Sequence, residues 1–178
     1  MAGDVFTEQG TNASMNEIAK RAGVGPGTLY RHFRDRDHLL DVLLADWIGR
    51  IQSAADEVIR TDLTPRALLI TWFEALIAHI SVHRGGAARF TTALGNPEST
   101  MASKWQGLVT ANTTVLHHLE RLEAIQPGVR SLQVCRLVGG VGTVADNGDL
   151  SSDDTKDLLN IIADALLIER SQPPVDAG

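Results

Sequence analysis

Apolar residues recur every three to four positions along most of this chain, which is the spacing of helices that bury one face. Segments that contain glycine or proline interrupt the pattern and mark helix ends. The longer helices predicted in this way cover about 36–59, 65–82, 87–94, 98–122, 129–145 and 153–170. No stretch shows the alternation of apolar and polar residues that predicts a half-buried strand. We therefore expect an all-α protein.

The stretch from Ser14 to Phe33 predicts two short helices joined by a tight turn. Ser14 and Glu17 have the spacing of a capping box, in which each residue satisfies a backbone donor at the start of a helix. Gly23 stands where the first helix should end in a left-handed residue, and Pro26 suits the first turn of the second. Such a pair of helices is a helix-turn-helix, whose second helix enters the major groove of DNA.

The second helix of this hairpin has an inner and an outer face. Leu29 and Phe33 are four residues apart and are predicted to face inward. The residues left facing outward are Thr28, Tyr30, Arg31 and His32. The chain has a net charge of −6, which argues against indiscriminate binding to nucleic acid. Between residues 18 and 36, however, five basic residues oppose Asp35 alone, which suits a reader that touches phosphates in one place.

These residues also carry a resemblance to a known family. It rests on Ile18-Ala19, Ala22-Gly23-Val24, Gly27-Thr28-Leu29-Tyr30, His32-Phe33 and Asp35-Arg36-Asp37-His38-Leu39-Leu40. In identity and spacing they resemble the DNA-binding end of the TetR family of bacterial transcriptional regulators. The resemblance implies a helix-turn-helix head on a larger helical domain, a homodimer, and a double-stranded operator released when a small-molecule effector binds.

The resemblance also implies which residues of the head meet DNA. By motif position, the expected contacts with the DNA backbone are Thr28, Tyr30, His32 and Arg36. The expected readers of base edges are Asn16, Gly27 and Arg31. Gly25-Pro26 replaces polar residues that many relatives carry, so we expect no direct base readout by that turn.

We predict two domains and a tail. The helix-turn-helix domain covers 1–45, the effector-binding and dimerisation domain covers 46–172, and a loose tail covers 173–178. Asp4–Gly10 resembles the last turns of the family's first helix, with Phe6 packing on the hairpin. Almost nothing precedes Asp4, so we expect this first helix to be shortened here, either because the head is short or because the natural chain starts further upstream. The long helix that begins at Arg36 is predicted to link the two domains.

Two residue sets in the larger domain are candidates for binding. The family resemblance implies an effector cavity, for which the candidate lining is Trp72, Phe73, Met101, Trp105 and Leu108. The alternative is that these residues form solid core. The last two helices carry more apolar surface than one packing partner needs, which predicts a dimer interface. Its candidate residues are Leu137, Val138, Val141, Val144, Leu158, Ile161, Ile162, Ala165 and Leu166.

Other chemistry is not favoured. Gly140-x-Gly142-x-x-Ala145 matches a dinucleotide fingerprint in form, but it lies within a predicted helix rather than after a strand, so close helix packing is the better interpretation. His79 and His83 have metal-ligand spacing without further ligands, and Cys135 is interpreted as a small core residue. We expect no cofactor, no metal and no enzymatic activity.

The sequence also predicts the location. A single cysteine fits a reducing compartment, no apolar run reaches the length of a membrane span, and the first ten residues are polar, so we expect a cytoplasmic protein. We expect a ligand-responsive repressor. The alternative is a helical ligand-binding or interaction protein whose shortened head does not bind DNA.

Overall fold

The computed structural model describes residues 14–82, 85–98, 102–148 and 150–168, which form helices and no strand. The helices are α2 (Met15–Ala22), α3 (Pro26–His32), α4 (Arg36–Val58), α5 (Pro65–Ile80), α6 (Gly86–Ala93), α7 (Ala102–Arg121), α8 (Ser131–Asp146) and α9 (Ser152–Leu166). The predicted all-α fold is confirmed. The segment Asp4–Gly10 with Phe6, and the tail from residue 173, lie outside the described residues.

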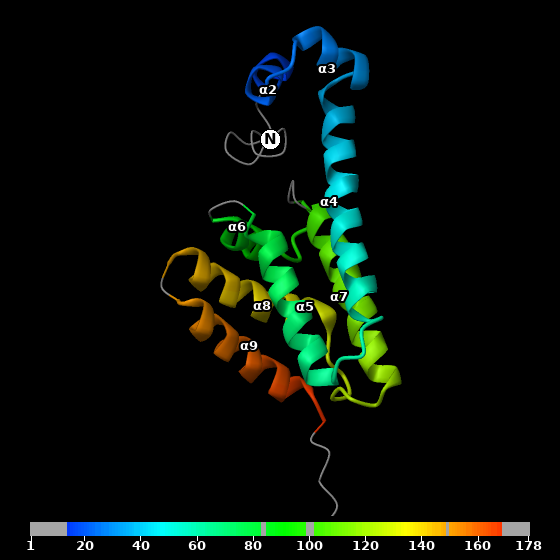
Figure 1. Cartoon of the computed structure of the whole chain (residues 1–178), viewed down its shortest axis with the longest axis vertical. Helices are drawn as coiled ribbons and strands as arrows, with labels where there is room; N and C mark the ends of the chain where they lie inside the picture. The colour runs from blue at the N-terminus through cyan, green and yellow to red at the C-terminus, as the bar shows by residue number, and fades with distance from the viewer. Residues whose placement is uncertain (1–13, 83–84, 99–101, 149, 169–178) are drawn as a thin grey trace, which may run out of the picture.

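A small head, formed by α2, α3 and the start of α4, stands at one end of a larger helical body (Figure 1). Each part has its own buried apolar cluster. The head cluster consists of Met15, Ile18, Ala19, Leu29 and Leu39, with Phe33 and Leu43 packed against it. The body cluster gathers residues from α4 to α9. The head is therefore a separate packing unit, joined to the body through α4.

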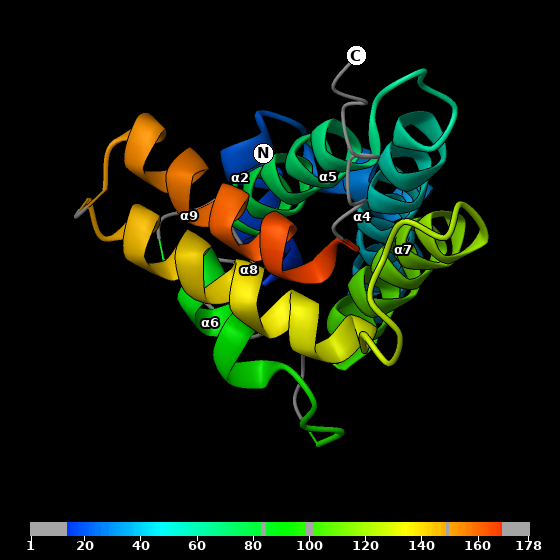
Figure 2. The ribbon, with the colours of Figure 1, turned by 90° about the horizontal axis from the view of Figure 1, so that it is seen from below.

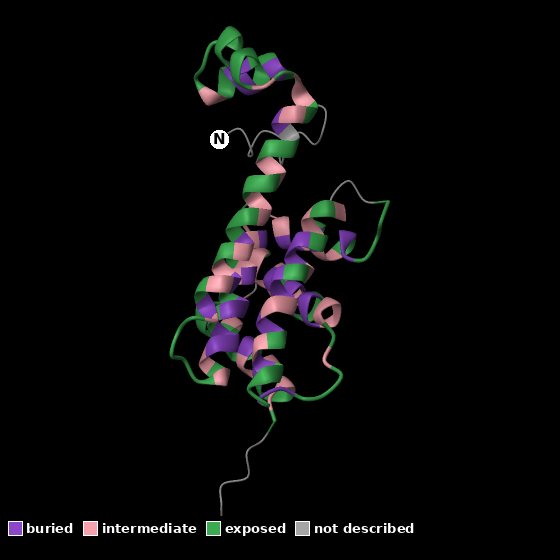
Figure 3. Ribbon diagram, turned by 90° about the vertical axis from the view of Figure 1, so that its right-hand side faces the viewer, coloured by how far each residue is buried: buried purple, intermediate pink, exposed green. Residues whose placement is uncertain are grey.

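The helix α4 runs from the head along the side of the body (Figure 1). Its start is fixed by Asp35, whose carboxylate accepts a hydrogen bond from the His38 backbone N–H at 2.9 Å. Between Leu43 and Trp47 the helix passes from one cluster to the other, and its side chains there are exposed or partly exposed (Figure 3). One continuous helix thus carries the head.

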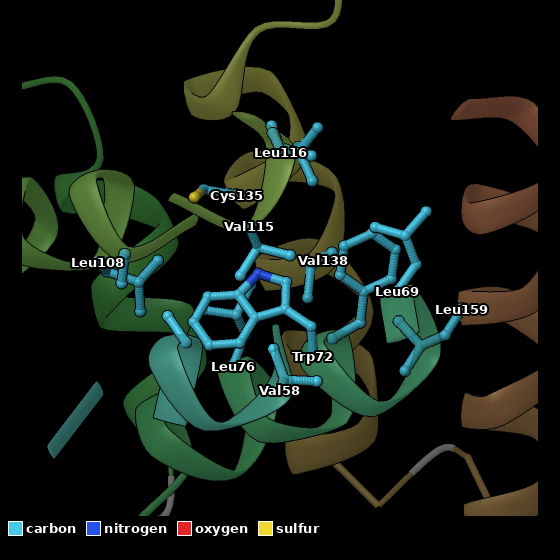
Figure 4. Close-up of a cluster of buried hydrophobic side chains, with 14 of the residues drawn as sticks. Val58, Leu69, Trp72, Leu76, Leu108, Val115, Leu116, Cys135, Val138 and Leu159 are labelled. Atoms are coloured by element: carbon cyan, nitrogen blue, oxygen red, sulfur yellow. The ribbon is translucent and has the colours of Figure 1, made fainter. Parts of the chain in front are cut away.

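The helix α5 is the centre of the body, because its side chains are buried on several faces. It begins as predicted, with the Thr64 hydroxyl accepting from the Ala67 N–H and Pro65 in the first turn. Trp72 lies in the middle of the core (Figure 4) and donates from Nε1 to Oδ1 of the buried Asn112 at 2.8 Å. The Asn112 amide donates in turn to the Ser131 hydroxyl at 2.9 Å. This network joins α5, α7 and α8.

The glycine-rich stretch of α8 permits close packing, as the sequence predicted. Gly139 lies so close to α6 that a Cβ there would stand 2.7 Å from Thr91 Oγ1. At Gly142 a Cβ would stand 3.4 Å from that of Ala87. The helix α6 packs on this side of α8, whereas α9 lies beside α8 on another side (Figure 2).

Several helix ends differ from the predicted ones. The longest difference is at α9, which ends at Leu166 rather than Arg170 because Leu167 turns into an isolated bridge with Ile125. The described part of α7 begins at Ala102, and Glu98, where this helix was predicted to start, lies in a turn in which the Asn96 side chain accepts from the Glu98 N–H. Among the described helices, none is long and apolar enough to cross a membrane.

Candidate DNA-binding site

The hairpin of the head is fixed by its capping residues. The Ser14 hydroxyl accepts from the Glu17 N–H at 3.2 Å, which is one of the two bonds of the expected capping box. Gly23 ends α2 at a φ of 70°, where an L side chain would be strained, and donates to the carbonyls of Ala19 and Lys20. The second helix then starts at Pro26, which needs no N–H in the first turn. The predicted helix-turn-helix is present.

Apolar contacts beneath the hairpin hold α3 in place. Ile18 and Ala19 of α2 are fully buried, and Ala19 is small enough for α3 to approach closely. Leu29 is the buried residue of α3, and Leu39 of α4 closes the cluster from below. Because Leu29 faces this cluster, the rest of α3 faces away from it.

Six of the seven predicted DNA contacts are exposed in the head. The residues that are exposed are Asn16, Gly27, Thr28, Tyr30, Arg31 and His32. Half of the Tyr30 surface is open to solvent. Arg36 differs, because it is partly buried at the first turn of α4. The expected DNA roles of all seven residues remain predictions.

Gly27 has no structural reason to be a glycine within this chain. A Cβ at this position would meet nothing within 4 Å, and the residue is exposed inside α3. A glycine in a helix is less favourable than alanine by about 0.5–1 kcal/mol. The missing side chain leaves the surface of α3 open at this position.

Positive charge extends beyond the residues chosen from the motif. Lys20 is exposed on α2, and the Arg34 side chain, 84% exposed, lies at the end of the hairpin. Arg34 pairs with Asp35. The pKa of the Asp35 carboxyl is lowered mainly by the hydrogen bond from the His38 backbone N–H and to a smaller extent by the Arg34 side chain. Lys20 and Arg34 were part of the basic segment but not of the predicted contact set, since the motif assigns them no role.

The predicted dimer face is only partly available to a partner. The large apolar residues of the set that are exposed are Leu137, Val144, Leu158 and Ile161, the last at 65%. Ala165 is also exposed, and the partly buried members are Val141, Ile162 and Leu166. Val138 is 1% exposed and packs in the core of its own chain, so its inclusion was wrong. Helical spacing alone does not show which apolar face of α8 meets α5.

Three of the residues predicted to line an effector cavity belong to the buried cluster of the body. Trp72, Phe73 and Leu108 are at most 2% exposed. Trp72 and Leu108 are shown in that cluster in Figure 4. Trp105 is partly buried and packs against the body cluster, and its indole N–H donates to the Asn96 carbonyl at 3.4 Å. Met101 lies outside the described residues.

One hollow in the body is lined by none of these residues. It lies between α5 and α9, with Ile77 and Leu159 among its lining residues, and has a volume of about 260 Å³. Lys156 and Glu74, which also line it, approach within 4.0 Å of each other.

The remaining titratable groups behave as structural residues. The Nε2 of His79 lies 3.1 Å from the Trp47 carbonyl oxygen, and burial lowers the pKa of the imidazole to about 4. His83 lies outside the described residues. Burial raises the pKa of the Cys135 thiol to about 12, which keeps it protonated. No group of three metal-ligating side chains occurs in the part of the chain that the structure describes.

The buried hairpin, its exposed second helix and the basic segment together define a helix-turn-helix DNA-binding domain. Residues 2–43 match the family model described as bacterial regulatory proteins, tetR family. An HTH-type transcriptional regulator of Staphylococcus aureus (strain USA300) is 55% identical over 40 residues, which are 22% of this chain and 22% of that protein. The chain thus aligns with about a fifth of the length of this curated relative.

The fold of the whole chain is similar to that of solved regulators. The TetR transcriptional regulator SCO0520 from Streptomyces coelicolor has a TM-score of 0.62 and 24% identity, covering 93% of this chain and 94% of that one. The fatty acid degradation regulator FadR from Bacillus halodurans has a TM-score of 0.66 and 18% identity, covering 92% of each. The ketosteroid transcriptional regulator KstR2 of Mycobacterium tuberculosis has a TM-score of 0.60 and 17% identity, covering 94% and 92%.

The head matches the TetR family in sequence, and the whole chain is similar in fold to solved TetR-family transcriptional regulators. The sequence identity that supports this lies in the head, and the body shares only the fold, so what the body binds does not follow from these similarities.

Proposed function

We propose that this protein is a homodimeric repressor that binds a double-stranded DNA operator through α2 and α3 and releases it when a small molecule binds the body. The observation that carries the proposal is the division of α3, with Leu29 buried and its polar residues exposed on a basic head. Exposed hydroxyl, imidazole and guanidinium groups are donors for phosphate oxygens and base edges.

Dimerisation supports this function because one head makes few contacts with DNA. Two-fold dimers read half-sites about one helical turn apart, some 34–36 Å or a multiple of it. The exposed apolar residues Leu137, Val144, Leu158 and Ile161 form the surface that we assign to the partner. Paired with the same surface of a second chain, α8 and α9 would form a four-helix bundle.

Tyr30 tests the DNA-binding role. Tyr30→Ala removes an exposed hydroxyl without opening the head cluster, so we expect the affinity for every DNA sequence to fall about equally. The measurement is fluorescence anisotropy on a fragment that contains the promoter of the protein's own gene and on an unrelated fragment. Val82→Ala, at an apolar residue 65% exposed on the body, is the control.

The outcomes separate the two functions under consideration. A change in which fragment Tyr30→Ala prefers would contradict its role as a backbone contact. The unaltered protein could instead bind neither this promoter nor any sequence selected from random DNA. That result would favour the alternative function, a helical ligand-binding or interaction protein whose head does not bind DNA.

A further inference from the structure

We infer that Gly107 is a positioning residue: its missing side chain lets Ile48 seat against α7, which sets the direction of α4 and so the separation of the two DNA-binding heads. The inference rests on the proposed dimeric function. It assigns to one position in the body control over which half-site spacing the dimer accepts.

The contact between Gly107 and Ile48 leaves no room for any side chain at 107. A Cβ on Gly107 would stand 2.8 Å from Ile48 Cγ1, 3.1 Å from Cγ2 and 3.3 Å from Cδ1. Distances below 3.0 Å do not occur between such atoms, so one side must move. Isoleucine is branched at Cβ and stiff about χ1 in a helix, which limits relief by rotation of the side chain alone. Relief therefore requires α4 to move away from α7.

Packing, rather than backbone conformation, accounts for glycine at this position. Gly107 lies inside α7 and has no positive φ, so alanine would suit the local helix better. The residue is buried beneath α4, as its near contact with Ile48 requires. The signal for this role in the sequence is an isolated glycine inside an apolar helical pattern. Gly107 was not among the residues predicted to be functional.

Further contacts hold α4 at the same level. Gln52 Nε2, one turn further along α4, donates to the Gly107 carbonyl at 3.1 Å. On the side of α5, the His79 ring lies 4.2 Å from that of Trp47 and its Nε2 lies 3.1 Å from the Trp47 carbonyl. The segment Trp47–Gln52 is thus held from both flanks, directly after the last contact of the head cluster at Leu43.

The contact between Ile48 and Gly107 lies far from the head along α4, so a small tilt of the helix at this contact becomes a larger displacement of the head. Ile48 stands about 18 Å along the helix axis from Arg36, given 1.5 Å per residue. A tilt of about 5° at the seat would therefore move the head by about 1.5 Å over that length. In a symmetric dimer both heads move, so their separation changes by a distance that matters for the fit to two fixed half-sites.

The chain provides a matched control for a substitution at Gly107. Gly49 also lies inside a helix, but a Cβ there would meet nothing within 4 Å. Gly49→Ala therefore makes the same chemical change on α4 itself without a clash. A compensating change is also available, because Ile48→Ala removes all three atoms that the new Cβ would meet.

The test measures the separation of the heads directly. Arg34→Cys, at a side chain 84% exposed in each head, carries a spin label, while Cys135 is buried at 2% exposure and stays unlabelled. Pulsed electron paramagnetic resonance gives the distance between the labels of the dimer. We expect Gly107→Ala to shift that distance and to lower affinity at least tenfold for DNA selected by the unaltered protein. Gly49→Ala should leave both unchanged, and Gly107→Ala with Ile48→Ala should restore both.

The outcomes are separable. A folded Gly107→Ala dimer with an unshifted distance overturns the inference, as does a double variant that fails to restore it. If Gly107→Ala does not fold, Ile48→Ala alone decides. With Gly107 unchanged, no methyl group fills the space that Ile48 leaves, so the distance distribution should broaden, and an unchanged width overturns the inference. An unaltered protein that is monomeric overturns the proposed function and this inference together, whereas a dimer with unmoved heads overturns only the inference.

Discussion

His79 shows how one partly buried side chain can serve structure rather than chemistry. It lies on α5, and its Nε2 must carry the hydrogen, because the Trp47 carbonyl can only accept. Burial lowers the pKa of the imidazole to about 4, and the charges of Arg50 on α4 and Lys104 on α7 lower it further, against the effect of the hydrogen bond. At neutral pH the ring is therefore uncharged.

This pKa predicts how stability depends on pH. Between pH 6.5 and 4 the unfolded chain binds a proton at His79 that the folded chain does not, so the free energy of unfolding falls as the pH falls through that range. We expect the free energy of unfolding to fall by about 1–2 kcal/mol from pH 7 to 4.5. This value is smaller than the full pKa shift would give, because the ring is only partly buried and solvent screens part of the effect. Urea titrations at the two pH values measure it.

His79→Gln is the control for this pH effect, because the amide keeps an N–H donor and does not titrate. The variant should lose less stability than the unaltered protein between pH 7 and 4.5. Equal losses in both proteins would assign the pH dependence to other groups. The carboxyl groups with lowered pKa values, Asp35, Asp154 and Asp164, contribute mainly below that range.

At the level of single helices, the sequence predicted what local chemistry determines. Ser14 was predicted as a capping residue, and Asp35 and Thr64 directly precede predicted helices; in each case the side chain accepts from the backbone N–H three residues on. Helix ends set by contacts between distant segments were missed. The end of α9 depends on the bridge from Leu167 to Ile125, which no local pattern records.

The same distinction between local and distant contacts decides which parts of the candidate site could be predicted from the sequence. The exposed face of α3 could be predicted, because the inward residues of a short helix follow from spacing once its hairpin is recognised. The inside of the body could not, since helices such as α5 and α8 are apolar on more than one face. Which face of α8 is covered depends on α5 and α6, and Val138 was misassigned for that reason.

Ser14→Ala tests the stability of the hairpin as an element. The substitution removes the acceptor for the Glu17 N–H at the start of α2, which should cost about 1 kcal/mol of head stability. Because the body has its own core, its unfolding temperature should not change. Amide hydrogen exchange measures this, with faster exchange expected in 15–32 and no change in α5.

Ser53→Ala is the matched substitution, made at an exposed residue inside α4 where serine caps nothing. It should not increase exchange in the head, since alanine favours a helix interior more than serine does. Faster exchange in α5 after Ser14→Ala would show that head and body unfold as one unit.

For the molecule as a whole, α4 is the element that both clusters share. Its first turns complete the head cluster at Leu39, and its later turns enter the body cluster at Ile51. A ligand that prefers one arrangement of the body can affect the head only through a difference in how α4 is held. The contacts from Trp47 to Gln52 are where such a difference would act first.

Assembly is the property of the whole molecule that the exposed surface predicts most directly. Ile161 on α9 is 65% exposed and stands with Leu137, Leu158 and Val144 among the exposed apolar residues of α8 and α9. Ile161→Arg places a charge in the centre of the proposed interface, where its burial against a partner is unfavourable. We expect a monomer at micromolar concentration by light scattering, with an unchanged circular dichroism spectrum.

The monomer should also lose specific DNA binding, because a single head contacts only one half-site. Val82→Arg makes the same change at a residue that is equally exposed, at 65%, but lies at the end of α5 outside the proposed interface. This control should remain dimeric and bind DNA as before. A dimeric Ile161→Arg protein would place the interface elsewhere, and a monomeric one that kept its full affinity for a two-half-site operator would show that the heads bind independently.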